Sequence, residues 1–310
     1  MKNLILLTFL FWSSFTFCQT PSGVLKEKEE RLKGYANKMI NAGMPEVRLK
    51  NDSLFTREFV QALKTPYSFN YTFDSLYNIS NLYAPDSSFR IFTWQLVMTD
   101  YVTRQHGAIQ MHTTDGSLKL FPLIDKSDIT DNIADTAGDN LGWIGAVYYK
   151  MFMKQAGSEK LYVLLGYDEN NLRSTKKIIE ILRFKEGKPW FGGNGFFTDT
   201  NGVVSSISRK VIEFKKDASP RVVYDPEIDM IIMEHLVSES NQPKKAFTLV
   251  GDGDYEGYKW KDNRWNYVKK VFNEVTEEGK TPMPQPIYET NPPTTEETKT
   301  KTKSVKKKKN

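Results

Sequence analysis

The stretch that decides the fold is residues 160–191, KLYVLLGYDENNLRSTKKIIEILRFKEGKPWF. Residues 161–165 form a short apolar run that stops at Gly166, which is typical of a strand buried on both faces. Gly, Asp and Asn then supply turn chemistry, and residues 176–184 form a second run rich in Ile and Phe. Glu186-Gly187-Lys188 can close a hairpin onto the Pro-Trp-Phe that follows. The stretch therefore predicts β-sheet.

Short strand patterns continue on both sides of this stretch. Residues 89–98 and 101–112 precede it, and residues 203–214 and 228–236 follow it, separated by turn sequences. No helix of crossover length lies between them, which argues against a parallel sheet. The spacing predicts on the order of a dozen short strands in an antiparallel sandwich, barrel or propeller-like meander.

Two helices are expected before the strands, over residues 23–40 and from about residue 53 to residue 64. The predicted fold class is therefore α+β, with short N-terminal helices followed by a mainly antiparallel β domain. The expected organisation is a leader over residues 1–18, a helical lead-in over 19–85, the β-rich domain over 86–276 and a disordered tail over 277–310.

The N-terminus has the pattern of a secretory signal peptide. Lys2 precedes an apolar run over residues 4–12, which is too short for the roughly 20 residues that a membrane span needs. Thr16 and Cys18 favour cleavage before Gln19. The alternative is a lipoprotein anchored through Cys18, although Phe17 is bulky for that processing. We expect export to the periplasm, the cell surface or the medium.

The single cysteine lies inside this leader. A mature chain without thiols excludes cysteine nucleophiles, cysteine-ligated zinc and iron–sulfur clusters. About 290 remaining residues are enough to bury a large core without disulfides. There are three histidines, His106, His112 and His235. The first two are six residues apart in a predicted strand, which places them on one face but too far apart to chelate a metal as a pair.

The net charge of +5 comes from the C-terminus. Residues 299–310 contain seven lysines and no acid; with Lys2 they account for eight of the 43 basic residues. The segment between the leader and this tail has the 35 remaining basic residues and all 38 acidic residues, so its net charge is near −3. The tail can touch anionic surfaces, but lysines without interleaved aromatics do not predict specific nucleic-acid binding.

Residues 89–271 resemble a group of exported bacterial-type hypothetical proteins. The resemblance lies in RIFTWQ (90–95), GAVYYK (145–150), YVLLGYDENN (162–171), KKIIEILRF (176–184), YDPEIDMIIMEHL (224–236) and GDYEGYKWKDNRW (253–265). It implies export and a single β-rich unit. It implies no activity and no catalytic residue.

One segment imitates the start of a calcium-binding loop. Asp252, Asp254 and Glu256 place oxygen ligands at alternate positions, and Gly257 follows them. Position 12 of such a loop is Asn263, where a bidentate Glu is required, and the next segment predicts a hairpin. These three residues form a candidate calcium site, with an acidic β-turn as the alternative.

The sequence favours a non-enzymatic exported protein that binds or scaffolds an envelope component or a glycan. Five tryptophans outside the leader can supply both a core and an aromatic contact surface: Trp94, Trp143, Trp190, Trp260 and Trp265. The alternative is a hydrolase that uses paired carboxylates. Its candidates are the acidic loop with Asp125, Asp128, Asp131, Asp135 and Asp139, and the turn Asp168-Glu169.

Overall fold

Two helices open the described part of this computed structural model, which comprises residues 20–99 and 102–272. Helix α1 (Pro21–Asn41) packs against helix α2 (Pro45–Leu63). Helix α2 begins earlier than the predicted start near residue 53. Proline is tolerated in the first helical turn because its missing N–H has no intrahelical partner there, and Pro45 therefore starts the helix that it was expected to precede.

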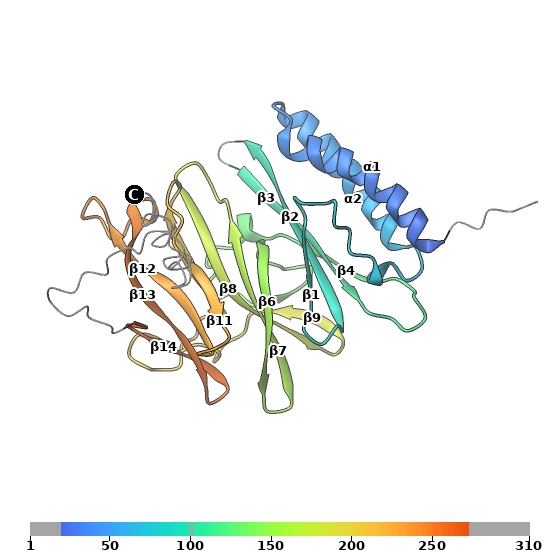
Figure 1. Ribbon diagram of the computed structural model, residues 1–310. Coiled ribbons are helices and arrows are strands. Elements are labelled where there is room, and N and C mark those ends of the chain that lie inside the picture. The colour runs from blue at the N-terminus through green and yellow to red at the C-terminus, as the bar shows by residue number, and fades with distance from the viewer. Residues whose placement is uncertain (1–19, 100–101, 273–310) are drawn as a thin grey trace, which may run out of the picture. The chain divides into compact units, whose positions relative to one another are not determined.

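Three antiparallel sheets follow the helices (Figure 1). The first has the order β1 (Ser80–Tyr83), β2 (Phe89–Thr99), β3 (Val102–Met111), β4 (Lys119–Ile124). The second has the order β5 (Gly138–Asp139), β9 (Lys188–Phe191), β8 (Ser174–Lys185), β7 (Glu159–Asp168), β6 (Val147–Ala156), and β10 (Arg209–Lys215) also pairs with β8. The third has the order β11 (Val222–Asp225), β12 (Met230–Ser238), β13 (Leu249–Lys261), β14 (Arg264–Val268). Short 3-10 helices occupy Ser68–Asn70, Ser127–Ile129 and Ala246–Thr248. The α+β prediction is confirmed.

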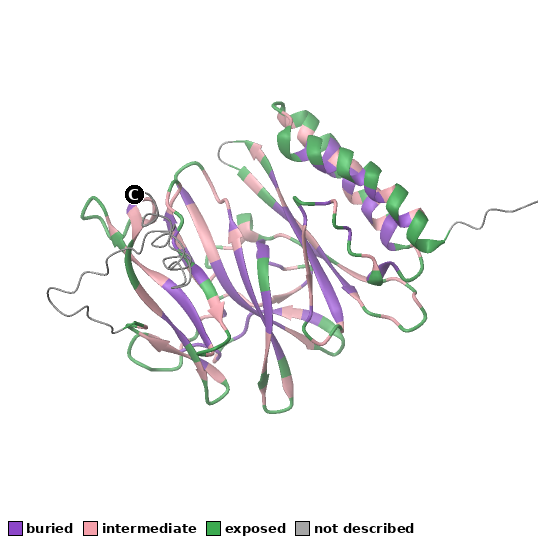
Figure 2. Ribbon diagram, viewed as in Figure 1, coloured by how far each residue is buried: buried purple, intermediate pink, exposed green. Residues whose placement is uncertain are grey.

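Strand β7 is buried on both faces, as its apolar run predicted. Leu161, Val163 and Leu165 belong to a core shared with the third sheet. Tyr162 and Leu164 point the other way, into a core shared with the first sheet. Figure 2 shows the buried residues along β7 and its neighbour β8. The second sheet is therefore the middle layer of the fold.

Strand β2 has the same two-sided burial. Phe92, Trp94 and Leu96 pack on the helices, and the rings of Phe55 and Trp94 meet edge to face with centroids 5.3 Å apart. Ile91, on the opposite face, packs toward the second sheet. The first sheet therefore lies between the helices and the middle layer.

A buried arginine joins the segment after α2 to the first sheet. Arg90 is fully buried, and its guanidinium donates to the carbonyls of Ser68 at 2.8 Å and Tyr71 at 2.6 Å. It also donates to the Tyr83 hydroxyl at 2.7 Å. Burial lowers the pKa of Arg90 to about 10. The helical lead-in and the strands thus share one core.

The predicted leader (1–18) and tail (277–310) lie outside the described residues. Within the described ranges, no helix has the length and apolar character needed to cross a membrane.

Candidate functional site

A groove of about 460 Å³ lies where the helices, the first sheet and strand β6 meet. We call it the tyrosine groove and define it by six of its lining residues: Arg48, Tyr77, Gln95, Val97, Tyr149 and Tyr167. Its volume falls within the roughly 300–1,000 Å³ typical of small-molecule sites. The groove thus has the size of a ligand site.

The alternation of β2 explains one wall of the groove. Ile91, Thr93, Gln95 and Val97 occupy alternate positions and therefore face the same side of the strand. Ile91 and Thr93 are fully buried, and the Thr93 hydroxyl accepts the backbone N–H of Tyr148 at 3.0 Å. Farther along, Gln95 and Val97 line the groove, and Val97 is 37% exposed. The wall is therefore the part of this face that the middle sheet leaves uncovered.

A β-bulge in β6 supplies the opposite wall. Tyr148 pairs with Gly166 and Lys150 with Leu165, so Tyr149 is the extra residue. The Tyr149 hydroxyl donates to the carbonyl of Val222 at 2.8 Å, which anchors the ring. Burial raises the pKa of Tyr149, so the hydroxyl keeps its proton. The bulge therefore fixes a tyrosine ring at the groove.

Two polar groups of the groove lack protein partners. The Arg48 Nε and Gln95 Oε1 atoms are buried, and neither has a hydrogen bond within the described residues. Such atoms cost free energy unless water or a ligand pairs with them. Tyr77 adds a ring that is 85% exposed. Rings, an amide and a guanidinium can bind a ligand through both apolar faces and hydrogen bonds.

The lining of the groove is mainly apolar, aromatic and amide in character, with one guanidinium. Among the described residues that line it, none carries a carboxylate, an imidazole or a thiol. The one serine hydroxyl, that of Ser80, donates to the backbone carbonyl of Tyr148.

A second pocket, of about 230 Å³, holds the carboxylates of Asp125 and Asp168. We call it the carboxylate pocket. Gln105 connects the two: its backbone N–H donates to Asp125 Oδ2 at 3.2 Å, and its Nε2 donates to Asp168 Oδ1 at 2.8 Å. Burial raises the pKa of Asp168, and the negative charge of Asp125 raises it further. The structure thus joins one acid from each segment predicted to carry the pair.

The other acids of those segments have separate positions. Asp128 lines the carboxylate pocket. Glu169 instead forms an ion pair with Lys216. Asp135 accepts from Asn132 at 2.6 Å. Asp139 accepts the backbone N–H of Leu141 at 2.9 Å, and Asp131 is exposed.

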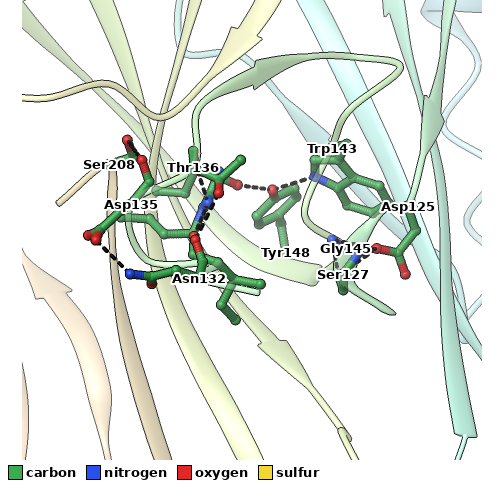
Figure 3. A network of polar contacts seen from close by, with 12 residues as sticks. Asp125, Ser127, Asn132, Asp135, Thr136, Trp143, Gly145, Tyr148 and Ser208 are labelled. Atoms are coloured by element: carbon green, nitrogen blue, oxygen red, sulfur yellow. Dashed lines mark hydrogen bonds and ion pairs between the residues drawn. The ribbon is translucent and has the colours of Figure 1, made fainter. Parts of the chain in front are cut away.

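Asp125 is held by its own loop. Its Oδ1 accepts the backbone N–H groups of Ser127 at 2.9 Å and Gly145 at 3.0 Å, as well as the Ser127 hydroxyl. Both carboxylate oxygens therefore have donors, which is typical of a carboxylate that shapes a loop. Figure 3 shows these contacts beside a second, buried network.

That buried network ties residues 131–136 to the middle sheet. Arg209 Nε donates to Glu180 Oε1 at 2.6 Å, and both side chains are almost fully buried. The Arg209 Nη1 atom donates to the carbonyls of Ile133 and Thr136. Tyr148 donates its hydroxyl to Glu180 and accepts from Trp143 Nε1 at 2.8 Å (Figure 3). Burial raises the pKa of Tyr148, so it stays a donor.

The candidate calcium ligands lie along β13. The pairing of β12 with β13 is irregular at residues 252–254, where Gly253 has a positive φ of 87°. The backbone N–H of Asp254 donates to Asp252 Oδ1 at 3.0 Å. Asp252 pairs with His235 Nδ1 at 2.8 Å, and Glu256 accepts from Tyr267 at 2.5 Å. Across residues 20–99 and 102–272, no group of three His, Cys, Asp or Glu side chains can hold a metal ion. The contact between Asp254 and Asp252 is typical of the acidic turn that was the alternative, and the calcium site stays a prediction.

The other two histidines lie on β3 and just after it, and His106 lines a further pocket together with Asp125 and Asp128. His106 stacks on Trp94 with ring centroids 5.7 Å apart and lies 3.7 Å from a carboxylate oxygen of Asp52. His112 meets the edge of Phe69 at 4.9 Å. These contacts are those of packed ring side chains.

Comparison with known proteins found no matching family model, curated protein or solved structure. The resemblance to exported hypothetical proteins therefore stays a prediction.

Proposed function

We propose that this chain is an exported, non-enzymatic protein of the cell envelope that binds a saccharide or another envelope component in the tyrosine groove. The observation that carries the proposal is the groove itself, with tyrosine rings beside unpaired Arg48 and Gln95 atoms. Tyrosine and amide side chains offer flat apolar contact together with hydrogen bonds, which suits a ring bearing hydroxyl groups.

Export and attachment rest on the sequence. The leader pattern around Lys2 and residues 4–12 supports export. The lysines of residues 299–310 support a weak electrostatic attachment to anionic surfaces outside the cell membrane or on it. Attachment of this kind would keep the groove close to envelope saccharides.

A groove-filling variant tests the proposal. Val97 lines the groove on β2, and Val97→Trp places a large ring where the ligand would lie. Val223→Trp on β11 is the matched control, because Val223 is 38% exposed against 37% for Val97 and does not line the groove. The assay is binding to a panel of neutral, acidic and amino-sugar oligosaccharides.

We expect wild type and Val223→Trp to bind the same members of the panel, and Val97→Trp to bind none. Equal binding by all three proteins would place the ligand elsewhere and contradict the proposal. Far-ultraviolet circular dichroism of each variant checks that the sheets are intact.

The second candidate is a hydrolase, and the joint placement of Asp125 and Asp168 in one pocket favours it. The buried Asp168, with its raised pKa, would be the general acid, and Asp125 the ionised partner. Asp168→Asn keeps the acceptor for Gln105 but removes the proton. Turnover of glycan or ester substrates that disappears in Asp168→Asn and persists in Val97→Trp would favour the hydrolase over the binding protein.

A further inference from the structure

The tyrosine groove has one charge. Arg48 is the only charged side chain among its described lining residues, and the rest are apolar, aromatic, amide or hydroxyl groups. A charge at a partly desolvated wall interacts more strongly than one in bulk water. The groove is therefore electrostatically complementary to an anion.

No acid of the protein satisfies that charge. Within residues 20–99 and 102–272, no carboxylate lies within 4.0 Å of Arg48. Asp52, one helical turn along α2, could have paired with it. Asp52 instead accepts from Trp94 Nε1 at 3.1 Å and faces His106. The guanidinium stays available to a ligand.

The surroundings of Arg48 indicate what bears the anion. Exposed Tyr77 and bulge residue Tyr149 supply ring faces, and Gln95 has a buried carbonyl oxygen without a donor. A sugar ring can meet the tyrosines with its apolar face and give hydroxyl donors to the amide oxygen. A planar carboxylate on that ring matches the paired donors of a guanidinium.

We infer that the groove recognises a saccharide that carries a carboxylate, such as an oligomer of uronic acid, with Arg48 as the residue that selects the acid. The inference rests on the proposed function, because it assumes that the groove is the binding site. It adds the ligand class and the residue that sets specificity.

The test compares oligogalacturonate with the same oligosaccharide after methyl esterification, which removes the charge but keeps the rings. Calorimetry measures both ligands with wild type, Arg48→Gln and Arg48→Lys. Arg31→Gln is the matched control, since Arg31 is an exposed arginine on α1 that does not line the groove.

We expect esterification to weaken binding to wild type by about ten-fold or more, the effect of losing a charged hydrogen-bonded pair. Arg48→Gln should show the same loss for the acid and no change for the ester. Arg48→Lys should be intermediate, because it keeps the charge without the paired donors. Arg31→Gln should match wild type.

Two results would overturn the inference and leave the proposed function intact. One is equal binding of acid and ester that Val97→Trp abolishes and Arg48→Gln does not change. The other is Val97→Trp-sensitive binding of a peptide carboxylate in place of the saccharide. If Val97→Trp alters the binding of no probe, the proposed function falls together with the inference.

Discussion

Substitution of Arg209 by methionine should strongly destabilise the fold. The side chain is 1% exposed, and it donates to Glu180 and to two carbonyls of the acidic loop. Methionine retains much of the volume but no donor. Among the residues that the structure describes, the fully buried Glu180 side chain would keep only the hydroxyl of Tyr148 as a partner. The variant therefore leaves a buried carboxylate without its counter-ion.

The expected loss of stability follows from the burial of this ion pair. Removing one partner of a buried ion pair costs about 3–5 kcal/mol, against a total stability of roughly 5–15 kcal/mol for a folded domain. A domain of this size loses about 2–4 °C in Tm per kcal/mol, so Tm should fall by about 10 °C. Urea denaturation monitored by tryptophan fluorescence gives the free energy, and a thermal melt gives Tm.

Lys215→Met is the control for this prediction. Lys215 also lies on β10 and pairs with Glu239, but both side chains are more than one third exposed. An exposed pair contributes about 0–1 kcal/mol. The double variant Glu180→Met/Arg209→Met should recover part of the loss, because it removes both buried charges. The reasoning is refuted if Arg209→Met lowers the free energy of unfolding no more than Lys215→Met does. It is also refuted if the double variant loses as much stability as Glu180→Met and Arg209→Met lose together.

Two further predictions concern Asp168 and the leader. The pKa of Asp168 is raised in the folded state, so its ionisation opposes folding above the unfolded pKa of about 3.9. Asp168→Asn should therefore be more stable than wild type at pH 7, and the difference should shrink as pH falls through the raised pKa and vanish below about 3.9. Denaturation midpoints between pH 3 and pH 7 measure this, and a constant difference would contradict it. The mature protein should begin at Gln19; an intact mass showing a lipidated Cys18 would instead establish a membrane anchor.

Local sequence patterns predicted much of the sheet structure. The run at residues 161–165 became β7, buried on both faces, since apolar residues at both alternate positions require two covering layers. The turn at Glu186-Gly187 formed because both residues adopt positive φ, 51° and 75°. In each case the information lies within a few consecutive residues.

The sequence also contains an indication of the buried network. Glu180 interrupts the apolar run of residues 176–184, and Arg209 begins a later strand. A charge in the middle of an otherwise buried strand predicts a buried partner. The sequence could not identify Arg209 as that partner, because the pairing of β8 with β10 brings together positions that share no spacing rule.

The sequence predicted the acids of the carboxylate pocket but not the tyrosine groove. The acidic loop and the turn at residue 168 were both proposed as sources of a carboxylate pair, and Asp125 and Asp168 share a pocket. The tyrosine groove was not foreseen. Arg48, Gln95 and Tyr149 come from a helix, a strand and a bulge that meet only because β6 crosses β1 and β2. Tyr149 faces the groove because of the bulge, which alternation alone cannot predict.

The location of a bound saccharide tests the central claim most directly. Amide NMR spectra of the deuterated protein, titrated with the tightest-binding member of the oligosaccharide panel, report which residues the ligand touches. We predict shifts at Tyr77, Gln95, Val97 and Tyr149, with a ligand that remains intact. Shifts confined to Gln105, Asp168 and Asn170 of the carboxylate pocket, or cleavage of the saccharide during the titration, would contradict the account of a binding protein.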